Sequence, residues 1–125
     1  MIKVSSILIG VTDLCRSKSF YEQVFDMRFD EFRPPFASAF LGDVEFNIEE
    51  NAPYRSERWA KNYIGGRKQV SFQVDNLKDF LKKASEFGAS VVQSIEEKDW
   101  GWSEAVIADF DGNEFIIEQE VAPGK

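Results

Sequence analysis

Carboxylates recur with alternating spacing in two short apolar runs of this chain, and they are its first candidates for chemistry. Glu45 and Glu49 stand two positions either side of Asn47, and Glu114 and Glu118 are spaced in the same way in a second run. Side chains two and four residues apart share one face of an extended strand. Such a row of carboxylates could ligate Mg²⁺, act as a general acid or base, or accept hydrogen bonds from a cationic or amine-rich ligand. The alternative is that these glutamates lie near strand ends and are simply solvated.

Histidine, which most often accompanies carboxylates in metal and acid–base sites, is absent from the chain. Nothing in the spacing specifies the octahedral placement that Mg²⁺ demands, so a carboxylate metal site is the weaker hypothesis. Cys15 is the single cysteine, and it stands at a predicted helix start where the helix dipole could lower its pKa. Without a histidine to serve as base, we interpret Cys15 as incidental to function.

The carboxylate runs belong to a sequence that repeats its own layout. Val11-Thr12-Asp13-Leu14 opens a helix-like segment, and Val74-Asp75-Asn76-Leu77 opens a second one. Asp13 and Asn76 are 63 residues apart, and Gly42 and Gly112, which precede the last strand of each half, are 70 apart. An internal duplication of this length predicts two copies of one supersecondary unit.

Hydrophobic periodicity predicts a βαβββ order for each half. In the first half the strands are 3–11, 27–32, 36–41 and 44–49, and Asp13 caps a helix whose buried stripe is Leu14, Phe20, Tyr21, Val24 and Phe25. Pro34-Pro35 separates two strands, and Gly42-Asp43 is a two-residue hairpin link.

The second half repeats this order after a connector. Its strands are 69–74, 90–95, 103–110 and 114–118, and its helix 77–87 ends before Gly88. In the connector, Trp59, Ala60 and Tyr63 indicate a short helical turn, whereas the tail 121–125 is predicted to be frayed. We therefore expect an α+β fold in a single domain 1–125, with module 1 at about 3–50, a connector at about 51–67 and module 2 at about 68–120.

Composition restricts the partners. With 43% hydrophobic and 30% charged residues the chain is ordinary globular protein. No apolar run approaches the ~20 residues that span a bilayer, and Met1 is not followed by a signal segment, so we expect a cytoplasmic protein without a membrane partner. A lone cysteine fits that compartment. The net charge of −7 argues against a nucleic-acid partner, whose phosphates would be repelled.

The two modules and two short motifs resemble the vicinal oxygen chelate superfamily, which includes glyoxalase I, bleomycin-resistance proteins and extradiol dioxygenases. The motifs are 11–14 followed by Phe20-Tyr21, and Asp109-Phe110-Asp111-Gly112-Asn113 before the last strand. The latter resembles the family's Asp-Pro-Asp-Gly-Asn turn with Phe110 in place of proline. Asp26 likewise stands where the family often has glycine. The resemblance covers roughly residues 3–120.

The resemblance implies that the curved mixed sheets of the two modules enclose a groove. In the family's enzymes, four groove residues, usually His and Glu, hold a divalent metal. The corresponding positions here are Ser6, Asn47, Gln69 and Ile116. A hydroxyl, two amides and an alkyl group offer no imidazole or anionic donor, so we expect no metal and no cofactor at these positions.

Strand alternation gives an independent prediction of the two sheet faces. The neighbours of these four positions are apolar and are predicted to pack on the helices: Ile7, Ile9, Phe46, Ile48, Val70, Phe72, Val74, Phe115 and Ile117. The opposite, more polar face carries the four positions and also Val4, Leu8, Glu45, Glu49, Ser71, Gln73, Glu114 and Glu118.

Aromatic residues in the connections complete the predicted binding site. Trp100-Gly101-Trp102 precedes the penultimate strand, where metal-free bleomycin-resistance proteins carry a Trp-Gly pair beside the drug groove. Trp59 lies in the connector, and indole rings can stack on planar or cationic ligands. The alternative is that these rings fill the groove or form a dimer contact. The predicted ligand-binding groove is thus Ser6, Glu45, Asn47, Gln69, Ser71, Glu114, Ile116, Trp59, Trp100 and Trp102.

Two functions remain open from the sequence. The first is a metal-free protein, closest in character to bleomycin-resistance-like members, that sequesters a planar or cationic antibiotic-like molecule. The second is a lyase, isomerase or dioxygenase of the same superfamily with a non-standard metal or a carboxylate base. The resemblance also implies a homodimer.

Overall fold

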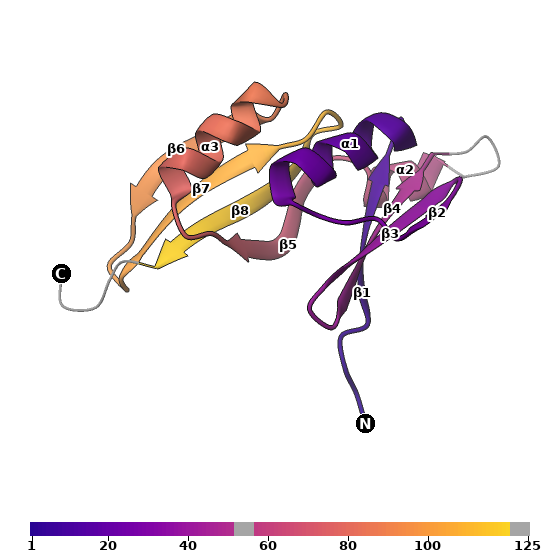
Figure 1. Ribbon diagram of the computed structural model, residues 1–125, viewed down its shortest axis with the longest axis horizontal. Helices are drawn as coiled ribbons and strands as arrows, with labels where there is room; N and C mark the ends of the chain where they lie inside the picture. The colour runs from indigo at the N-terminus through magenta and orange to yellow at the C-terminus, as the bar shows by residue number, and fades with distance from the viewer. Residues whose placement is uncertain (52–56, 121–125) are drawn as a thin grey trace. The chain divides into compact units, whose positions relative to one another are not determined.

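The computed structural model describes residues 1–51 and 57–120, which divide into two compact units with the boundary between Gly65 and Gly66. Each unit contains one four-stranded mixed sheet, and three helices accompany the sheets (Figure 1). The predicted α+β class and the βαβββ order of each half are confirmed.

The first unit is built around a sheet with the strand order β1-β4-β3-β2. β1 runs parallel to β4, and the other neighbours are antiparallel. The bounds are β1 Ser6–Val11, α1 Leu14–Phe25, β2 Glu31–Arg33, β3 Phe36–Leu41, β4 Val44–Glu50 and α2 Glu57–Tyr63.

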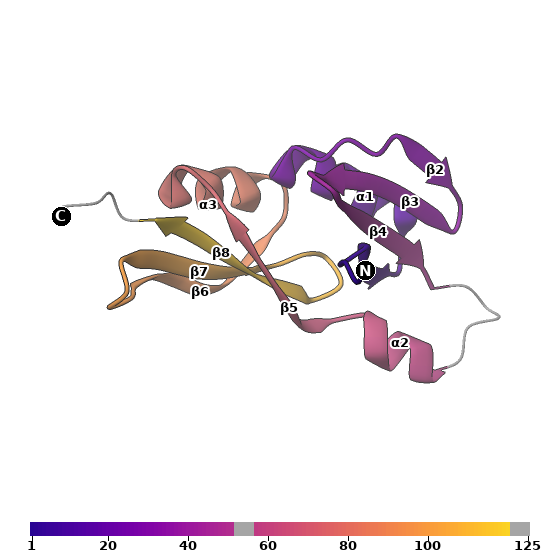
Figure 2. The same cartoon turned by 90° about the horizontal axis from the view of Figure 1, so that it is seen from below.

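The second unit repeats this topology with the strand order β5-β8-β7-β6, and its parallel pair is β5 with β8. Its helix, α3, contacts β6, β7 and β8, as α1 contacts β3 and β4 in the first unit (Figure 2). The bounds are β5 Gly66–Gln73, α3 Leu77–Glu86, β6 Ser90–Glu97, β7 Trp102–Ala108 and β8 Asn113–Glu120.

The same cap starts the main helix of each unit. Asp13 Oδ1 accepts a hydrogen bond from the backbone N–H of Arg16, and Asn76 Oδ1 accepts one from Asp79, both at 3.0 Å. A side-chain oxygen at this position satisfies one of the backbone donors that a helix leaves unpaired at its start. The predicted N-cap at Asp13 is confirmed.

A second hydrogen bond ties each helix start to the last strand of its sheet. Glu50 Oε2 accepts from the backbone N–H of Leu14 at 3.1 Å, and Gln119 Oε1 accepts from that of Leu77 at 2.7 Å. A side chain from the strand thus satisfies another free donor of the helix, which fixes where the helix sits on the sheet.

The apolar face of each sheet packs against its helix. In the first unit the Tyr21 ring lies 5.6 Å from the Phe25 ring and 5.1 Å from the Phe46 ring, centroid to centroid. In the second, Phe72 meets Phe115 edge-on at 5.6 Å. Of the residues predicted to pack on the helices, Ile9, Phe46, Ile48, Phe115 and Ile117 are buried and Ile7, Val70, Phe72 and Val74 are half-buried.

Some predicted bounds were wrong. β1 begins at Ser6 and not at Lys3, because Ser6 already pairs with Glu45 near the start of β4, and Lys3 has no strand beside it. The predicted strand 27–32 overlaps β2, Glu31–Arg33, only at its last two residues. Met27 and Phe29 lie in an irregular segment before β2, and both side chains are buried. Their spacing of two residues therefore gives the same alternating pattern as a strand.

Smaller shifts occur elsewhere. β5 begins at Gly66 instead of Gln69, and its register with β8 shifts between Arg67 and Ser71. The predicted helical turn around Trp59 is α2. The tail 121–125 lies outside the described residues. No helix among the described residues is long and apolar enough to cross a membrane.

Candidate functional site

The candidate site lies on the face of the first sheet that points away from α1, which we call the first open face. Strand pairing arranges its residues in rows: Leu8, Asn47, Ser38 and Glu31 form one row across β1, β4, β3 and β2. The alternate residues Ala37, Ala39, Phe46 and Ile48 are buried beneath it. The neighbouring rows are Ser6, Glu45 and Phe40 on one side, and Gly10, Glu49, Phe36 and Arg33 on the other.

A pocket of about 270 Å³ occupies this face, lined by Glu31, Arg33, Phe36, Ser38, Glu45 and Asn47. All six residues belong to the first open face, so the pocket is formed within the first unit. Small-molecule sites typically enclose about 300–1,000 Å³. The pocket therefore suits one ring or head group of a ligand.

Asn47 supplies an unused acceptor at the pocket wall. Its Oδ1 atom is buried and has no hydrogen-bond partner among the described residues. A buried acceptor without a donor costs about 1–3 kcal/mol of stability. A ligand N–H group that reached this oxygen would remove that cost.

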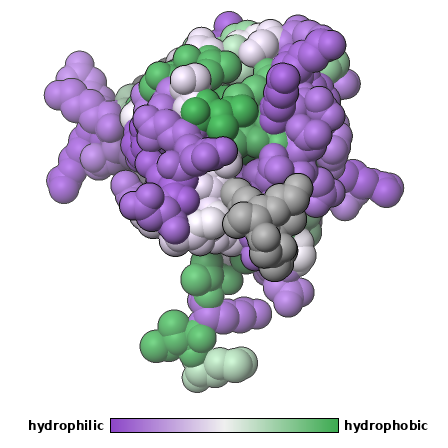
Figure 3. All heavy atoms as spheres, turned by 90° about the vertical axis from the view of Figure 1, so that its left-hand side faces the viewer, coloured by the Kyte–Doolittle hydropathy of each residue, from purple (hydrophilic) through white to green (hydrophobic). Residues whose placement is uncertain are grey.

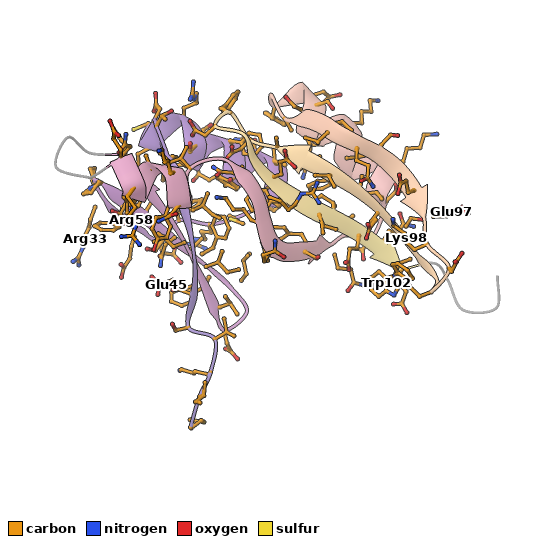
Figure 4. The ribbon with its side chains drawn as sticks, turned by 180° about the vertical axis from the view of Figure 1, so that it is seen from behind. Arg33, Glu45, Arg58, Glu97, Lys98 and Trp102 are labelled. Carbon is orange, nitrogen blue, oxygen red and sulfur yellow. The ribbon has the colours of Figure 1, made fainter. Side chains whose placement is uncertain are left out.

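The charged residues of the pocket are also without partners. Among the residues that the structure describes, Glu31, Arg33 and Glu45 make no ion pair and no side-chain hydrogen bond. Arg33 and Glu45 come from β2 and β4, on either side of β3, and both are labelled in Figure 4. Neighbouring strands are about 4.8 Å apart, so β2 and β4 lie about 10 Å from each other. The two charged side chains therefore line one pocket from strands that are not neighbours.

Aromatic rings flank the same face. Phe36 lines the pocket with 42% of its surface exposed, and Phe40 is 62% exposed. The end of α2 approaches the face at Gly10, where an added Cβ would lie 2.9 Å from the Tyr63 carbonyl oxygen. Trp59 and Tyr63 stack within α2 with ring centroids 5.4 Å apart.

On the corresponding face of the second sheet, which we call the second open face, three carboxylates are paired with cations. Glu114 Oε1 meets Arg67 Nε at 3.1 Å. Lys98 Nζ lies 3.0 Å from Glu96 Oε2 and 3.4 Å from Glu104 Oε1. Glu114, Glu96 and Glu104 therefore each have a cation within their own unit, whereas Glu118 on the same face has no ion pair among the described residues.

Both lysines of the second unit that have a shifted pKa respond to local surroundings. The hydrogen bond to Glu96 raises the pKa of Lys98, with Glu104 adding to the effect against a smaller opposing effect of burial. Burial lowers the pKa of Lys68, although the Asp109 carboxylate acts in the opposite direction. Asp109 is itself buried and accepts hydrogen bonds from Asn113 and Asp111.

The structure divides the predicted site residues between the two units. Ser6, Glu45 and Asn47 share the first open face. Ser71, Glu114 and Ile116 share the second open face, and exposure alternates along β5 so that Gln69 falls on the same side. Trp59 lies in α2, Trp100 is 68% exposed in the β6–β7 turn, and Trp102 begins β7. The pocket includes Glu45 and Asn47 but not Ser6.

Four pocket residues lie outside the predicted groove: Glu31, Arg33, Phe36 and Ser38. Phe36 and Ser38 share one face of β3, and the predicted strand 36–41 contained both. Arg33 lay beyond the predicted strand 27–32, whereas Glu31 lay within it but was not assigned to a face.

The four positions that hold metal in the family's enzymes do not fit a metal ion. Ser6, Asn47, Gln69 and Ile116 provide no imidazole or carboxylate, the donors on which transition-metal sites depend. Within residues 1–51 and 57–120, no group of three or more His, Cys, Asp or Glu side chains is placed to hold a metal ion.

The sequence as a whole matches one family model, described as the Glyoxalase/Bleomycin resistance protein/Dioxygenase superfamily, over residues 3–117. The chain belongs to this superfamily. The predicted resemblance is confirmed, since the match extends over both βαβββ modules. No curated protein sequence matches the chain significantly.

Solved structures of the superfamily share the fold. A glyoxalase/bleomycin resistance protein/dioxygenase family enzyme from Burkholderia phytofirmans PsJN has a TM-score of 0.81 at 24% identity, with 96% of this chain and 100% of that chain covered. TnmS3, an antibiotic binding protein from Streptomyces sp. CB03234, has a TM-score of 0.74 at 17% identity, covering 96% and 97%. TioX from Micromonospora sp. ML1 has a TM-score of 0.71 at 20% identity, covering 96% and 100%. At these identities the likeness establishes the fold alone.

Proposed function

We propose that this protein is a metal-free binding protein that sequesters a planar, antibiotic-like small molecule without transforming it. The observation that carries the proposal is a contrast within the site. In this chain, the four positions that hold metal in the superfamily's enzymes carry no metal-ligating side chains. The first open face, in contrast, holds a pocket in which Asn47 Oδ1 has no hydrogen-bond partner among the described residues. A site of this kind can hold a ligand by hydrogen bonds and ring contacts without activating it.

In the proposed mechanism, the pocket receives one ring of the ligand against Phe36, and Ser38 and Asn47 orient the ligand through hydrogen bonds. Ring contacts of this kind contribute about 0.5–1.5 kcal/mol beyond the buried area. That TnmS3, a protein of the same fold, is described as antibiotic binding supports this type of ligand. The proposal also includes a cytoplasmic homodimer, as the superfamily resemblance suggests.

The decisive experiment combines metal analysis with a ligand screen. Protein purified without added metal is analysed for Zn, Ni, Mn and Fe, then treated with chelator and screened by thermal shift against planar antibiotics and amines. We expect no stoichiometric metal and at least one ligand that raises stability. A ligand at 100 times its dissociation constant should add about 2.7 kcal/mol.

Variants connect a positive result to the site. Asn47→Leu should abolish most of the thermal shift, whereas Arg28→Gln, an exposed substitution outside the pocket, should retain it. Stoichiometric metal that the protein needs for binding, or turnover of any screened ligand, would refute the proposal and favour the enzymatic alternative. A screen in which no compound stabilises the protein would refute it as well.

A further inference from the structure

The charges of the two open faces differ in a way that bears on the kind of ligand. Within the second unit, Arg67 pairs with Glu114, and Lys98 is shared between Glu96 and Glu104. Glu45 occupies the position in the first unit that Glu114 occupies in the second. Unlike Glu114, Glu45 has no cation partner among the described residues. Three charged groups without partners among the described residues, Glu31, Arg33 and Glu45, therefore lie at one pocket.

Arg33 distinguishes this pocket further. Arg33 pairs with Phe36 in the first sheet, and Glu96 pairs with Glu104 at the equivalent place in the second sheet. The first sheet thus has an arginine at the position where the second has a glutamate. A protein with net charge −7 repels anions in general. An arginine without a carboxylate partner is then a specific local attraction for an anionic group, because its planar guanidinium binds carboxylate or phosphate oxygens in pairs.

We propose that the pocket binds a planar ring compound that carries both an anionic group and a protonated or amide N–H group, an inference that rests on the proposed function. Arg33 pairs with the anion at one end of the pocket. Asn47 Oδ1 and the Glu45 carboxylate accept from the N–H group at the other end, and Phe36 lies against the ring.

The strand geometry supports this orientation. β2 and β4 are separated by β3, so Arg33 and Asn47 are about two strand spacings, or roughly 10 Å, apart across the sheet. Direct pairing of opposite charges across that gap is prevented, and a ligand of one ring with two substituents spans it. Glu31, two residues from Arg33 and in the row of Asn47, disfavours an anion over the middle of the pocket and so directs it to Arg33.

Four probes that share one ring with substituents at its opposite ends separate these contributions: 4-(aminomethyl)benzoic acid, 4-(aminomethyl)benzamide, 4-(acetamidomethyl)benzoic acid and 4-(acetamidomethyl)benzamide. They present both charges, the cation, the anion and neither charge. Affinities are measured by ligand-observed NMR, which detects weak binding, at about pH 6, where the primary amine is protonated and the carboxylic acid is ionised. We expect the doubly charged probe to bind about twofold to fivefold more tightly than either singly charged probe, as for a partly exposed ion pair.

Variants assign each end of the ligand. Arg33→Gln should remove the advantage of the carboxylate and leave that of the amine, and Glu45→Gln should do the reverse, while Arg28→Gln and Glu86→Gln change neither. Equal affinity for all four probes, binding of none, or an unchanged preference in Arg33→Gln would overturn this inference. The antibiotic screen does not depend on ligand charge, so the proposed function would then be judged separately by that screen.

Discussion

The two units share one frame, by which we mean their helix caps, strand order and strand pairing, and they differ in the residues on their open faces. Asp13 and Asn76 cap the two main helices, and Glu50 and Gln119 bond to the helix starts from the last strands. The two sheets have the same strand order and pairing. These features are local requirements of a βαβββ module, because backbone donors at a helix start must be satisfied in any copy.

The open faces differ residue by residue in otherwise equivalent rows. The first sheet carries Leu8, Asn47, Ser38 and Glu31 where the second carries Ser71, Ile116, Val106 and Gln93. Asn47 leaves an acceptor unpaired, whereas Ile116 at the equivalent position has nothing to satisfy. The comparison teaches that duplication kept the packing and that the polar face is where the two copies diverged.

The largest expected effect tests the shared frame. Phe46 and Phe115 occupy equivalent positions and are both 0% exposed. Phe46→Ala and Phe115→Ala should each cost about 3–5 kcal/mol through lost burial and a residual cavity. Urea unfolding followed by fluorescence measures this, with a Trp100→Phe/Trp102→Phe background leaving Trp59 to report on the first unit and a Trp59→Phe background leaving the other two to report on the second. A cost under about 1 kcal/mol for either variant would break the equivalence.

A smaller effect is expected at Gly10 of β1, whose equivalent in the second unit is Gln73 of β5. Gly10 faces the Tyr63 backbone, and the equivalent Gln73 lies exposed on β5. Gly10→Ala places a Cβ 2.9 Å from that carbonyl and should cost about 1–3 kcal/mol, as overpacking does. Gln73→Ala should change stability by less than about 0.5 kcal/mol. Chemical unfolding measures the free energy of unfolding of both variants. If Gly10→Ala leaves that free energy unchanged, the end of α2 does not pack closely against β1.

Exchanging the residues at the equivalent positions Asn47 and Ile116 tests whether the unpaired amide oxygen distinguishes the two open faces. Asn47→Ile removes the unpaired acceptor and should leave stability unchanged or raise it by about 1 kcal/mol, while ligand binding is lost. The reciprocal Ile116→Asn brings a new amide into the second face and should cost about 1–3 kcal/mol. Stability and binding are measured on the same samples. If Asn47→Ile stays folded and binds ligand normally, the role assigned to Asn47 is wrong.

The smallest effect concerns pH within the second unit. The pKa of Lys68 lies below 10.5, so between its folded pKa and 10.5 the unfolded chain binds more protons and stability rises with pH. The pKa of Lys98 lies above 10.5, so its contribution is present below 10.5 and is lost as pH rises through the folded pKa. NMR titration of the lysine side chains, assigned with Lys68→Gln and Lys98→Gln, should show the two midpoints in this order. The reverse order would contradict it.

Much of the frame could be predicted from the sequence because its signals are local. The N-cap at Asp13, the hairpin at Gly42-Asp43 and the alternation of β4 depend on a few neighbouring residues. The bounds of β2 could not be predicted, since Met27 and Phe29 are buried without belonging to a strand. That error concealed Arg33, because a residue is placed on a face only when its strand and register are known.

The sequence by itself determined the duplication, the order of elements and the lack of metal donors at the superfamily's metal positions. These follow from residue identity and spacing, which need no partner across the fold. Tertiary structure alone decided which polar groups are paired. The pairing of Glu114 with Arg67 and the isolation of Glu45 depend on strands far apart in the chain, because register brings a cation to one carboxylate and not to the other. In the view of Figure 3, hydrophilic residues cover most of the visible surface and hydrophobic residues lie among them.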